Sequence, residues 1–237
     1  MENKLSIIIV TYNAAATLQA CLDSVFAQTY PNLELVVIDG NSSDGTQDIL
    51  KANSLRITFW KSEPDDGIYY AMNKALQHTT GDFIYFLGAD DELLPGFSAM
   101  AEELKSPDTV YYGSVLTRGL PPLGPVSRYY LAKVGIIQQS IFYPKVVFEK
   151  YSYNLKYPTS ADFALNMQCL GDKELKFVYR HHTIANFAYT GASGQSLDKV
   201  FEADKSALIF KNFGLKIWLR YRFRLFKDSL RTKKRLN

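Results

Sequence analysis

The sequence contains few cysteine and histidine residues, which limits the kinds of site that it can form. Its two cysteines, Cys21 and Cys169, both lie in apolar patterns typical of helices. We therefore expect them to be reduced core residues, as in a cytoplasmic protein. The three histidines, His78, His181 and His182, do not have the spacing of zinc ligands, so no zinc site is predicted.

Long apolar runs and several familiar binding motifs are also absent. No stretch of 18 apolar residues occurs, so no membrane-spanning helix is predicted. The short apolar run near the N-terminus follows acidic as well as basic residues, unlike a signal peptide. Neither G-x-G-x-x-G after the first strand, nor G-x-x-x-x-G-K-[ST], nor G-x-S-x-G is found. These absences argue against an NAD-binding Rossmann domain, a P-loop kinase and a serine hydrolase.

Apolar content is ample, and its pattern predicts an α/β domain. With 237 residues, of which 47% are apolar, the chain is long enough to bury a core. Continuous apolar runs typical of buried parallel strands alternate with helical patterns. The predicted strands are 5–10, 35–38, 57–60 and 83–87, and the predicted helices are 18–26, 47–52 and 68–77. This alternation predicts a Rossmann-like, mostly parallel central sheet flanked by helices.

The second half of the chain is less regular. It contains four short predicted strands, a Pro/Gly-rich loop and two predicted helices, the first with Ser160 as its cap. The strands are 109–113, 140–143, 177–179 and 184–188, the loop is 117–128, and the helices are 163–170 and 197–210. We interpret 1–210 as one domain whose second half is a substrate-specific elaboration, and 211–237 as a basic helical tail.

Polar clusters follow four of the predicted strands. They are Thr11-Tyr12-Asn13, Asp39-Gly40, residues 63–67 (EPDDG) and Asp90-Asp91. Because the carboxyl ends of parallel strands lie along one edge of a sheet, these clusters should form a single crevice. This many carboxylates would repel a bare phosphate. An anionic ligand must therefore bring a metal ion with it, or the crevice must instead bind the hydroxyl groups of its ligand. A nucleotide sugar held with Mg²⁺ or Mn²⁺ meets both demands. Taken alone, Asp90-Asp91 could equally be a polar turn that caps a helix.

Three stretches together resemble a known family. They are LSIIIVTYNAAATLQACLDSVFAQTYPNLELVVIDGNSSDGT, SEPDDGIYYAMNKAL and GDFIYFLGADD. In this order they are similar to family 2 glycosyltransferases of the GT-A fold, and in particular to bacterial enzymes that build surface polysaccharides. The resemblance is close over residues 4–95 and loose to about residue 190. It implies inverting transfer from a nucleotide sugar, most simply a UDP-sugar, to a hydroxyl of a glycan or polyprenol-linked acceptor, with Mn²⁺ or Mg²⁺ as cofactor. Residues 1–95 would bind the donor and 96–210 the acceptor.

The resemblance also implies roles for individual residues. Asp162 corresponds to the catalytic base, Asp91 to the metal ligand, and Gln138 and Gln139 to a segment near the acceptor. The residues implied in donor binding are Thr11, Asn13, Asp39, Asp66, Asn73, Lys74 and Asp90. From its position alone, Asp162 could instead be a first-turn acid stabilised by the helix dipole.

Three positions depart from the family pattern. Ala89 occupies the first position of the DXD element, Tyr70 stands where relatives have Asp, and Gln138 replaces a histidine. The first departure favours metal binding by a single carboxylate. The second bears on which sugar the donor carries.

Positive charge is concentrated at the C-terminus. Residues 211–237 carry ten Lys/Arg and one acid, Asp228, whereas the first 210 residues have a net charge of −6. A basic amphipathic helix with Trp and Phe predicts attachment to a membrane surface, here the inner face of the cytoplasmic membrane. The alternative is a terminal helix packed on the domain with a solvated basic edge. No motif accompanies the tail that would predict nucleic-acid binding.

Two other functions remain to be weighed against a glycosyltransferase. A degenerate member of the family could bind a sugar nucleotide or lipid without catalysis and act as a scaffold at the membrane. The presence of Asp39, Asp91 and Asp162 favours an enzyme. A metal-dependent nucleotidyltransferase would use a similar sheet, but its basic Gly-rich loop after the first strand is missing here.

Overall fold

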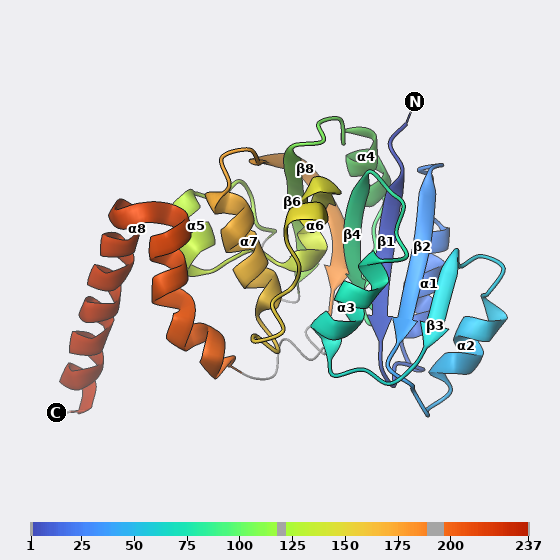
Figure 1. The fold of residues 1–237 in the computed structure, drawn as a ribbon, viewed down its shortest axis with the longest axis horizontal. Coiled ribbons are helices and arrows are strands. Elements are labelled where there is room, and N and C mark those ends of the chain that lie inside the picture. Colours follow the sequence, from blue (N-terminus) through green and yellow to red (C-terminus); the bar gives the residue numbers. More distant parts are fainter. Residues whose placement is uncertain (1, 118–121, 189–196, 237) are drawn as a thin grey trace.

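The computed structural model describes residues 2–117, 122–188 and 197–236. Its first half is the predicted parallel α/β unit (Figure 1). β1 pairs in parallel with β2 and β4, and β2 pairs in parallel with β3. The strands are β1 (Leu5–Thr11), β2 (Leu33–Asp39), β3 (Phe59–Ser62) and β4 (Phe83–Gly88). The helices between them are α1 (Leu18–Phe26), α2 (Thr46–Ala52) and α3 (Ile68–Leu76).

The second half extends the same sheet with strands of mixed direction, in the order β3-β2-β1-β4-β7-β6-β8-β5. β7 is antiparallel to both β4 and β6, and β8 is parallel to β6. The added strands are β5 (Glu92–Leu93), β6 (Thr109–Thr117), β7 (Ile141–Pro144) and β8 (Lys176–Phe187). The added helices are α4 (Gly96–Glu102), α5 (Arg128–Lys133), the 3₁₀ turn η1 (Gln138–Ser140), α6 (Val146–Lys150), α7 (Ala161–Gly171) and α8 (Lys199–Leu236). The half of the sheet whose strand ends form the predicted crevice, β1 to β4, is parallel.

Several strands differ from the sequence-based prediction: β3 (Phe59–Ser62) was expected at 57–60, β6 (Thr109–Thr117) was expected at 109–113, and β5 (Glu92–Leu93) was not expected. Two short strands were expected at 177–179 and 184–188, but β8 is continuous from Lys176 to Phe187. The polar segment between the apolar runs stays in the strand because β6 pairs with β8 on both sides of it, through Tyr112–Tyr179 and Ser114–Thr183. Register shifts between Tyr112 and Val115 absorb the irregularity there.

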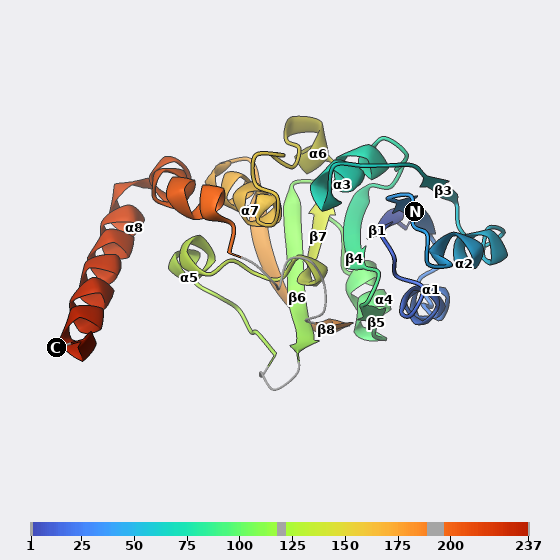
Figure 2. The same ribbon diagram turned by 90° about the horizontal axis from the view of Figure 1, so that it is seen from below.

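Apolar residues on the two faces of the sheet form two core layers. Ile8 belongs to one layer, and its neighbours Ile7 and Ile9 belong to the other, as alternation along a strand requires. Helices α3 and α5–α8 contribute to the first layer, and α1, α2 and α4 to the second (Figure 2). The two free cysteines are buried in these layers as predicted. Burial on both faces explains why the central strands read as unbroken apolar runs.

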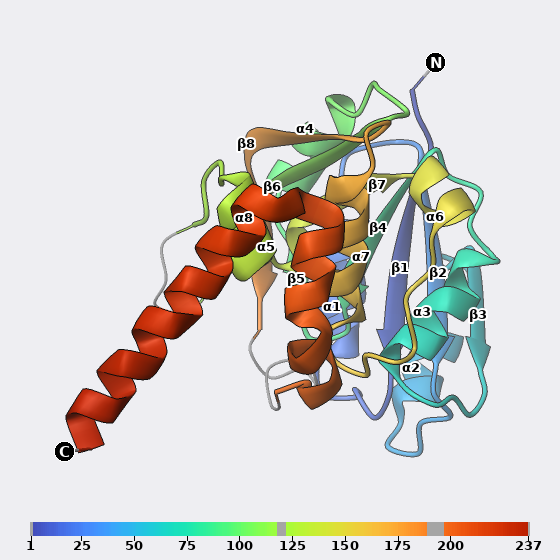
Figure 3. The ribbon, with the colours of Figure 1, turned by 60° about the vertical axis from the view of Figure 1, so that its left-hand side comes forward.

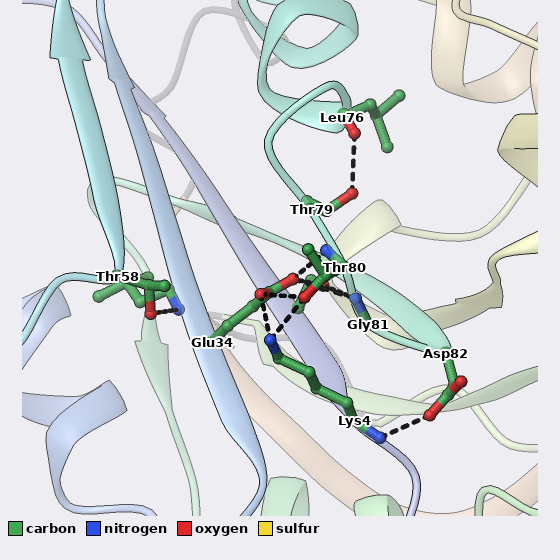
Figure 4. A network of polar contacts seen from close by, with 10 residues as sticks. Lys4, Glu34, Thr58, Leu76, Thr79, Thr80, Gly81 and Asp82 are labelled. Atoms are coloured by element: carbon green, nitrogen blue, oxygen red, sulfur yellow. Dashed lines mark hydrogen bonds and ion pairs between the residues drawn. The ribbon is translucent and has the colours of Figure 1, made fainter.

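A buried glutamate network ties together the amino-terminal edge of the sheet (Figure 4). Glu34, at the start of β2, forms an ion pair of 2.7 Å with Lys4 and accepts hydrogen bonds from Ser6, Thr80 and Gly81. Burial alone would raise the pKa of Glu34, but the hydrogen bonds from Lys4, Ser6 and Thr80 outweigh it and lower this pKa to about 2. The network joins β1, β2 and the segment before β4. The Glu34 network lies at the opposite end of β2 from Asp39, so it does not occupy the carboxyl edge of the sheet, where the predicted site lies.

Helix α8 consists of two parts that meet at Gly214, where φ is 77°. Only glycine adopts this conformation readily. The first part packs on the domain through buried Phe201 and Ile209, in contact with α7 and α5. The second part first packs on the domain through buried Tyr221, with Ile217 and Trp218 against the same core, and then extends away from it (Figures 1 and 3). In the described part of the chain, no helix is both long and apolar enough to cross a bilayer.

Candidate active site

The parallel register places the polar strand ends side by side. Thr11 at the end of β1 pairs with Asp39 at the end of β2, and Asp39 pairs with Ser62 at the end of β3. On the other side of β1, Val10 pairs with Gly88, which immediately precedes the segment that carries Asp90 and Asp91. The four clusters that sequence analysis assigned to one crevice therefore share the carboxyl edge of the sheet.

Asp39 is completely buried at this edge and is held by two serines. Its Oδ2 atom accepts hydrogen bonds from the Ser42 N–H at 2.9 Å and the Ser62 hydroxyl at 2.6 Å, and its Oδ1 atom accepts one from the Ser42 hydroxyl. Asn13 is held by the same loop, because its N–H donates to Ser42 Oγ and its Oδ1 accepts from the Ser43 N–H. Asn13 has a φ of 50°, so these contacts fix a conformation that few residues adopt. The carboxylate of Asp39 is thus rigidly placed.

Thr11 and Tyr12 have features that point to a ligand. The Thr11 Oγ1 atom is buried and has no hydrogen-bond partner among the described residues, which is uncommon for a buried hydroxyl. The Tyr12 side chain is 67% exposed. A Cβ atom on Gly40 would lie 3.0 Å from Asp65 Oδ2 and 3.3 Å from the Tyr12 ring, so both side chains gather over this glycine. Sequence analysis did not single out Tyr12 or Asp65 as site residues.

A hollow of about 350 Å³ opens beside this cluster. Its lining includes Lys74, whose Nζ atom is 2.6 Å from Glu63 and lies over the Tyr70 ring. The full lining is Glu63, Pro64, Asp65, Asp66, Tyr70 and Lys74. Hydrogen bonds from Lys61 and Lys74 lower the pKa of Glu63 to about 2. The structure therefore brings Asp66 and Lys74 together in one hollow.

Asn73 faces away from this hollow. Its Nδ2 atom donates to the Tyr153 carbonyl at 2.9 Å, and its Oδ1 atom accepts from the Tyr153 N–H at 3.0 Å. The amide of Asn73 therefore holds the chain segment that leads into α7. The side-chain contacts of Asn73 therefore lie outside the hollow, although the resemblance implied a donor-binding role for this residue.

Asp91 and Asp90 approach the backbone of Gly88 closely. A Cβ atom there would lie 2.5 Å from Asp91 and 3.0 Å from Asp90, so only glycine fits. Asp91 is 1% exposed and accepts hydrogen bonds from the N–H groups of Gly88 and Ala188. Burial raises the pKa of Asp91 to about 7, the Ala188 N–H opposes this, and the charge of Asp90 adds to it.

The Asp91 carboxylate, with Asp90 beside it, fits a divalent cation that is shared with a ligand. The groups that shift the pKa of Asp91 most include a second carboxylate, so a metal ion would relieve the charge that is buried here. No group of three or more His, Cys, Asp or Glu side chains within the described ranges could hold a metal. The protein would then supply few ligands, and phosphates or water the rest, as Mg²⁺ sites commonly require.

A chain of contacts connects Asp91 with Asp162 through the 3₁₀ turn. The Gln139 side chain lies near enough to Asp91 to lower its pKa, and its neighbour Gln138 donates to the Tyr153 hydroxyl at 2.7 Å. The ring of Tyr153 packs against that of Tyr69, with centroids 5.1 Å apart. The Tyr69 hydroxyl donates to Asp162 Oδ1 at 2.6 Å. The predicted metal ligand, acceptor segment and base therefore belong to one contiguous region.

Asp162 lies in the first turn of α7, as predicted. Burial raises the pKa of Asp162, while the Tyr69 hydroxyl and the Phe163 N–H lower it. A carboxylate whose pKa is raised above its ordinary value is a stronger base, and such groups are typical of active sites. Sequence analysis did not identify Tyr69 as a partner of Asp162. The available signal was weak: Tyr69 lies one helical turn before Asn73, on the apolar face of α3.

Comparisons with known proteins agree on one family. Residues 6–161 match the family model described as glycosyl transferase family 2. A PGL/p-HBAD biosynthesis glycosyltransferase of Mycobacterium bovis is 36% identical over 213 residues, which cover 83% of this chain and 81% of the relative. The Escherichia coli protein WfgD, named UDP-Glc:alpha-D-GlcNAc-diphosphoundecaprenol beta-1,3-glucosyltransferase, is 44% identical over 87 residues, covering 36% of this chain and 34% of that protein.

Solved structures share the fold at low sequence identity. S. aureus TarS 1-349 in complex with UDP superposes with a TM-score of 0.71 at 18% identity, covering 94% of this chain and 72% of TarS 1-349. The mannosyltransferase PcManGT of Pyrobaculum calidifontis, in complex with GDP-Man and Mn²⁺, gives a TM-score of 0.65 at 17% identity, covering 90% of this chain and 64% of PcManGT. This chain spans 43% of a longer TarS chain. These likenesses establish the GT-A-like architecture.

Proposed function

The chain belongs to glycosyl transferase family 2, and from this we propose that it transfers a sugar from a UDP-sugar to a hydroxyl of a glycan or polyprenol-linked acceptor. The setting we propose is bacterial surface-polysaccharide synthesis. The names of two relatives support this, since one acts in PGL/p-HBAD biosynthesis and the other on a diphosphoundecaprenol-linked sugar. The observation that carries the proposal is the contiguous region that joins Asp91, Gln138, Gln139 and Asp162 at the edge of the sheet.

We propose that the nucleotide lies over the ends of β1 and β2. The exposed ring of Tyr12 offers a stacking surface for the base, and the Thr11 hydroxyl offers an unused hydrogen-bonding group. Asp39, fixed by Ser42 and Ser62, supports the assignment of this edge to the base, with Asn13 beside it. The hollow that contains Asp66 and Lys74 offers a cation to the phosphates, and Asp90 is the candidate for the ribose. The donor thus falls within residues 1–95.

The proposed reaction is a single displacement with inversion. Asp162 accepts the proton of the acceptor hydroxyl, whose oxygen forms a bond to the anomeric carbon of the sugar. The bond from that carbon to the diphosphate oxygen breaks, and its electron pair leaves with the nucleoside diphosphate. Burial around Asp162 supports this role because it makes the carboxylate a stronger base. Residues 96–210, which include Gln138 and Gln139, would bind the acceptor.

We propose Mn²⁺ or Mg²⁺ as the cofactor, held by Asp91. When bound, the ion would act as a Lewis acid toward the charge that develops on the diphosphate. The burial of Asp91 next to Asp90 supports this proposal, as does the presence of Mn²⁺ in the PcManGT complex. The protein's own part is to keep the Asp91 carboxylate fixed through the N–H groups of Gly88 and Ala188.

Release of nucleoside diphosphate provides the direct test of this function. The protein is incubated with UDP-, GDP- and dTDP-sugars, with Mn²⁺ or Mg²⁺, in the presence of membrane extracts that supply lipid-linked acceptors. We expect metal-dependent release of UDP from one UDP-sugar. Release from a GDP- or dTDP-sugar instead would overturn the choice of nucleotide. Donor binding without turnover in these extracts would favour a sugar-nucleotide-binding scaffold over an enzyme.

We further propose that residues 211–237 attach the enzyme to the inner face of the cytoplasmic membrane. In the second part of α8, a stripe of apolar side chains lies 46–59% exposed along one face: Leu215, Leu219, Phe223, Phe226 and Leu230. Basic residues flank this stripe, among them Lys216, Arg220, Arg224, Lys227 and Arg231. Insertion of the apolar face, with about 1 kcal/mol per basic residue from anionic lipids, would hold the helix in the interface.

Vesicle flotation tests this attachment. We expect the wild-type protein to float with phosphatidylglycerol vesicles and not with phosphatidylcholine vesicles. Replacing both Phe223 and Phe226 with aspartate should reduce the bound fraction at least about tenfold, since each buried Phe contributes about 1.5–3 kcal/mol. Leu55→Asp is the control, because Leu55 is a fully exposed apolar residue outside α8. Equal flotation of wild type and the Phe223/Phe226 variant would contradict the proposal, as would no flotation of either.

A further inference from the structure

We propose that Tyr69 is a positioning residue for the base, its hydroxyl fixing the Asp162 carboxylate in the orientation and charge state that proton transfer requires. The inference rests on the proposed function, because it presupposes that Asp162 is the base. Neither the resemblance to the family nor the sequence pattern linked Tyr69 with Asp162. The proposal is based on the geometry of α3, one face of which lines the hollow while another contacts Tyr153 and Asp162.

Helix α3 presents different residues to the two halves of the site. Tyr70 and Lys74 line the hollow at the ends of the first strands. Tyr69, which is only 5% exposed, faces the second half and contacts Tyr153 and Asp162. One helix therefore carries groups for the proposed donor pocket on one face and the partner of the proposed base on another.

A second contact fixes the distance between α3 and the segment before α7. Asn73 lies one turn after Tyr69 and makes two hydrogen bonds to the backbone of Tyr153. The chain between Tyr153 and Asp162 is therefore attached to α3 at both of its ends. A side chain held between two such attachments loses rotational freedom, which is how neighbouring residues pre-organise a catalytic group.

The hydrogen bond from Tyr69 dominates the immediate surroundings of Asp162. Within the described ranges, Tyr69 is the side chain that hydrogen-bonds to Asp162, and the backbone N–H groups of Phe163 and of Asp162 itself also lower its pKa. The other titratable groups that face Asp162 are Tyr143 on β7 and Tyr153 before α7, both buried and neutral at ordinary pH. A hydrogen bond to an ionised carboxylate is charge-assisted and favours the ionised form.

The effect of removing the Tyr69 hydroxyl on the pKa of Asp162 can therefore be predicted. Without this donor the ionised form of Asp162 is less stable, so its pKa rises further. The acid limb of the pH–rate profile should move to higher pH by about 1 unit, so turnover at a fixed pH on that limb should fall by about tenfold. Donor affinity should stay within about twofold of wild type, because the Tyr69 ring remains and the hollow does not contain it.

The test is the pH dependence of turnover in Tyr69→Phe, compared with Tyr151→Phe. Tyr151 also donates to a carboxylate, Asp172, at 2.9 Å, but it lies outside the crevice. We expect the acid limb to shift in Tyr69→Phe and to stay in place in Tyr151→Phe. An unchanged profile in Tyr69→Phe, or the same shift in both variants, would overturn the proposal. A stronger donor at position 69, 3,5-difluorotyrosine, should move the acid limb toward lower pH, which tests the same bond even if Tyr69→Phe folds poorly.

The failure of this inference can be distinguished from failure of the proposed function. If Asp162→Asn keeps wild-type turnover, Asp162 is not the base and the role of Tyr69 falls with it. If Asp162→Asn is inactive but neither substitution at position 69 moves the acid limb, Asp162 remains the base and Tyr69 only fills space. The positioning role stands when Asp162→Asn is inactive and the two changes at position 69 shift the profile in opposite directions.

Discussion

Asp162→Asn is expected to lower turnover by about 10³-fold or more while leaving donor affinity within about twofold of wild type. The substitution keeps the size of the side chain but removes the group that accepts the proton, and general-base catalysis typically contributes 10²–10⁴-fold. The proposed donor pocket lies at the ends of β1–β4, whereas Asp162 lies in the first turn of α7. Turnover is measured as UDP release at saturating donor, and affinity by calorimetric titration with UDP.

The matched control for this substitution is Asp172→Asn. Asp172 follows the other end of α7 and, like Asp162, accepts a hydrogen bond from a tyrosine hydroxyl. Its loss should change stability slightly and turnover little, because Asp172 borders Lys150 and Glu174 rather than the crevice. Equal losses in the two variants would point to a general effect on α7, and full turnover in Asp162→Asn would remove this residue from the role of base.

The pH dependence of wild-type turnover also tests whether Asp162 is the base. The folded-state pKa of Asp162 is raised, so the carboxylate becomes protonated at a higher pH than an ordinary aspartate. A base works only when ionised, so turnover should be complete above this pKa and decline as the pH falls through it. The acid limb should therefore lie above the ordinary aspartate range, and it should be absent from any residual activity of Asp162→Asn.

The carboxyl edge of the sheet could be predicted from sequence because it depends on local patterns and one general rule. The runs before Thr11, Asp39 and Asp90 are apolar enough to identify buried strands, and parallel strands that alternate with helices must end on the same edge. The register Thr11–Asp39–Ser62 follows from that topology. Resemblance to a family then supplied roles that the pattern alone left open.

The contacts across the crevice could not be predicted in the same way. Tyr69 and Asp162 are 93 positions apart, and Asn73 and Tyr153 are 80 apart. No periodicity links such pairs, because their meeting depends on how β7 and α7 return to the sheet. Asn73 was therefore interpreted as a donor ligand from its motif, although both of its amide atoms are hydrogen-bonded to Tyr153. The continuous β8 has the same cause, since it depends on pairing with β6 on both sides of the polar middle.

Asp91→Asn is expected to remove most of the metal dependence of donor binding, with about tenfold weaker UDP affinity in Mn²⁺ and at least about 10²-fold lower turnover. The turnover estimate reflects the several kcal/mol that a Lewis acid contributes to the developing charge, at 1.36 kcal/mol per tenfold change. Asp90→Asn is the matched comparison, because it removes one negative charge from the adjacent residue.

The two variants separate ligation from simple loss of charge. Asp91 is buried and fixed by two backbone N–H groups, whereas Asp90 is partly exposed, so the fixed carboxylate is the better candidate for holding an ion in one place. Titration with UDP is carried out in Mn²⁺ and in EDTA for both variants, with the melting temperature as a measure of folding. If Mn²⁺ still strengthens UDP binding in Asp91→Asn but no longer does so in Asp90→Asn, the ligand is Asp90 and the two assignments must be exchanged. If both variants retain the full effect of Mn²⁺, the acidic pair does not hold the ion, because removing either charge should at least weaken a site that is built from so few protein ligands.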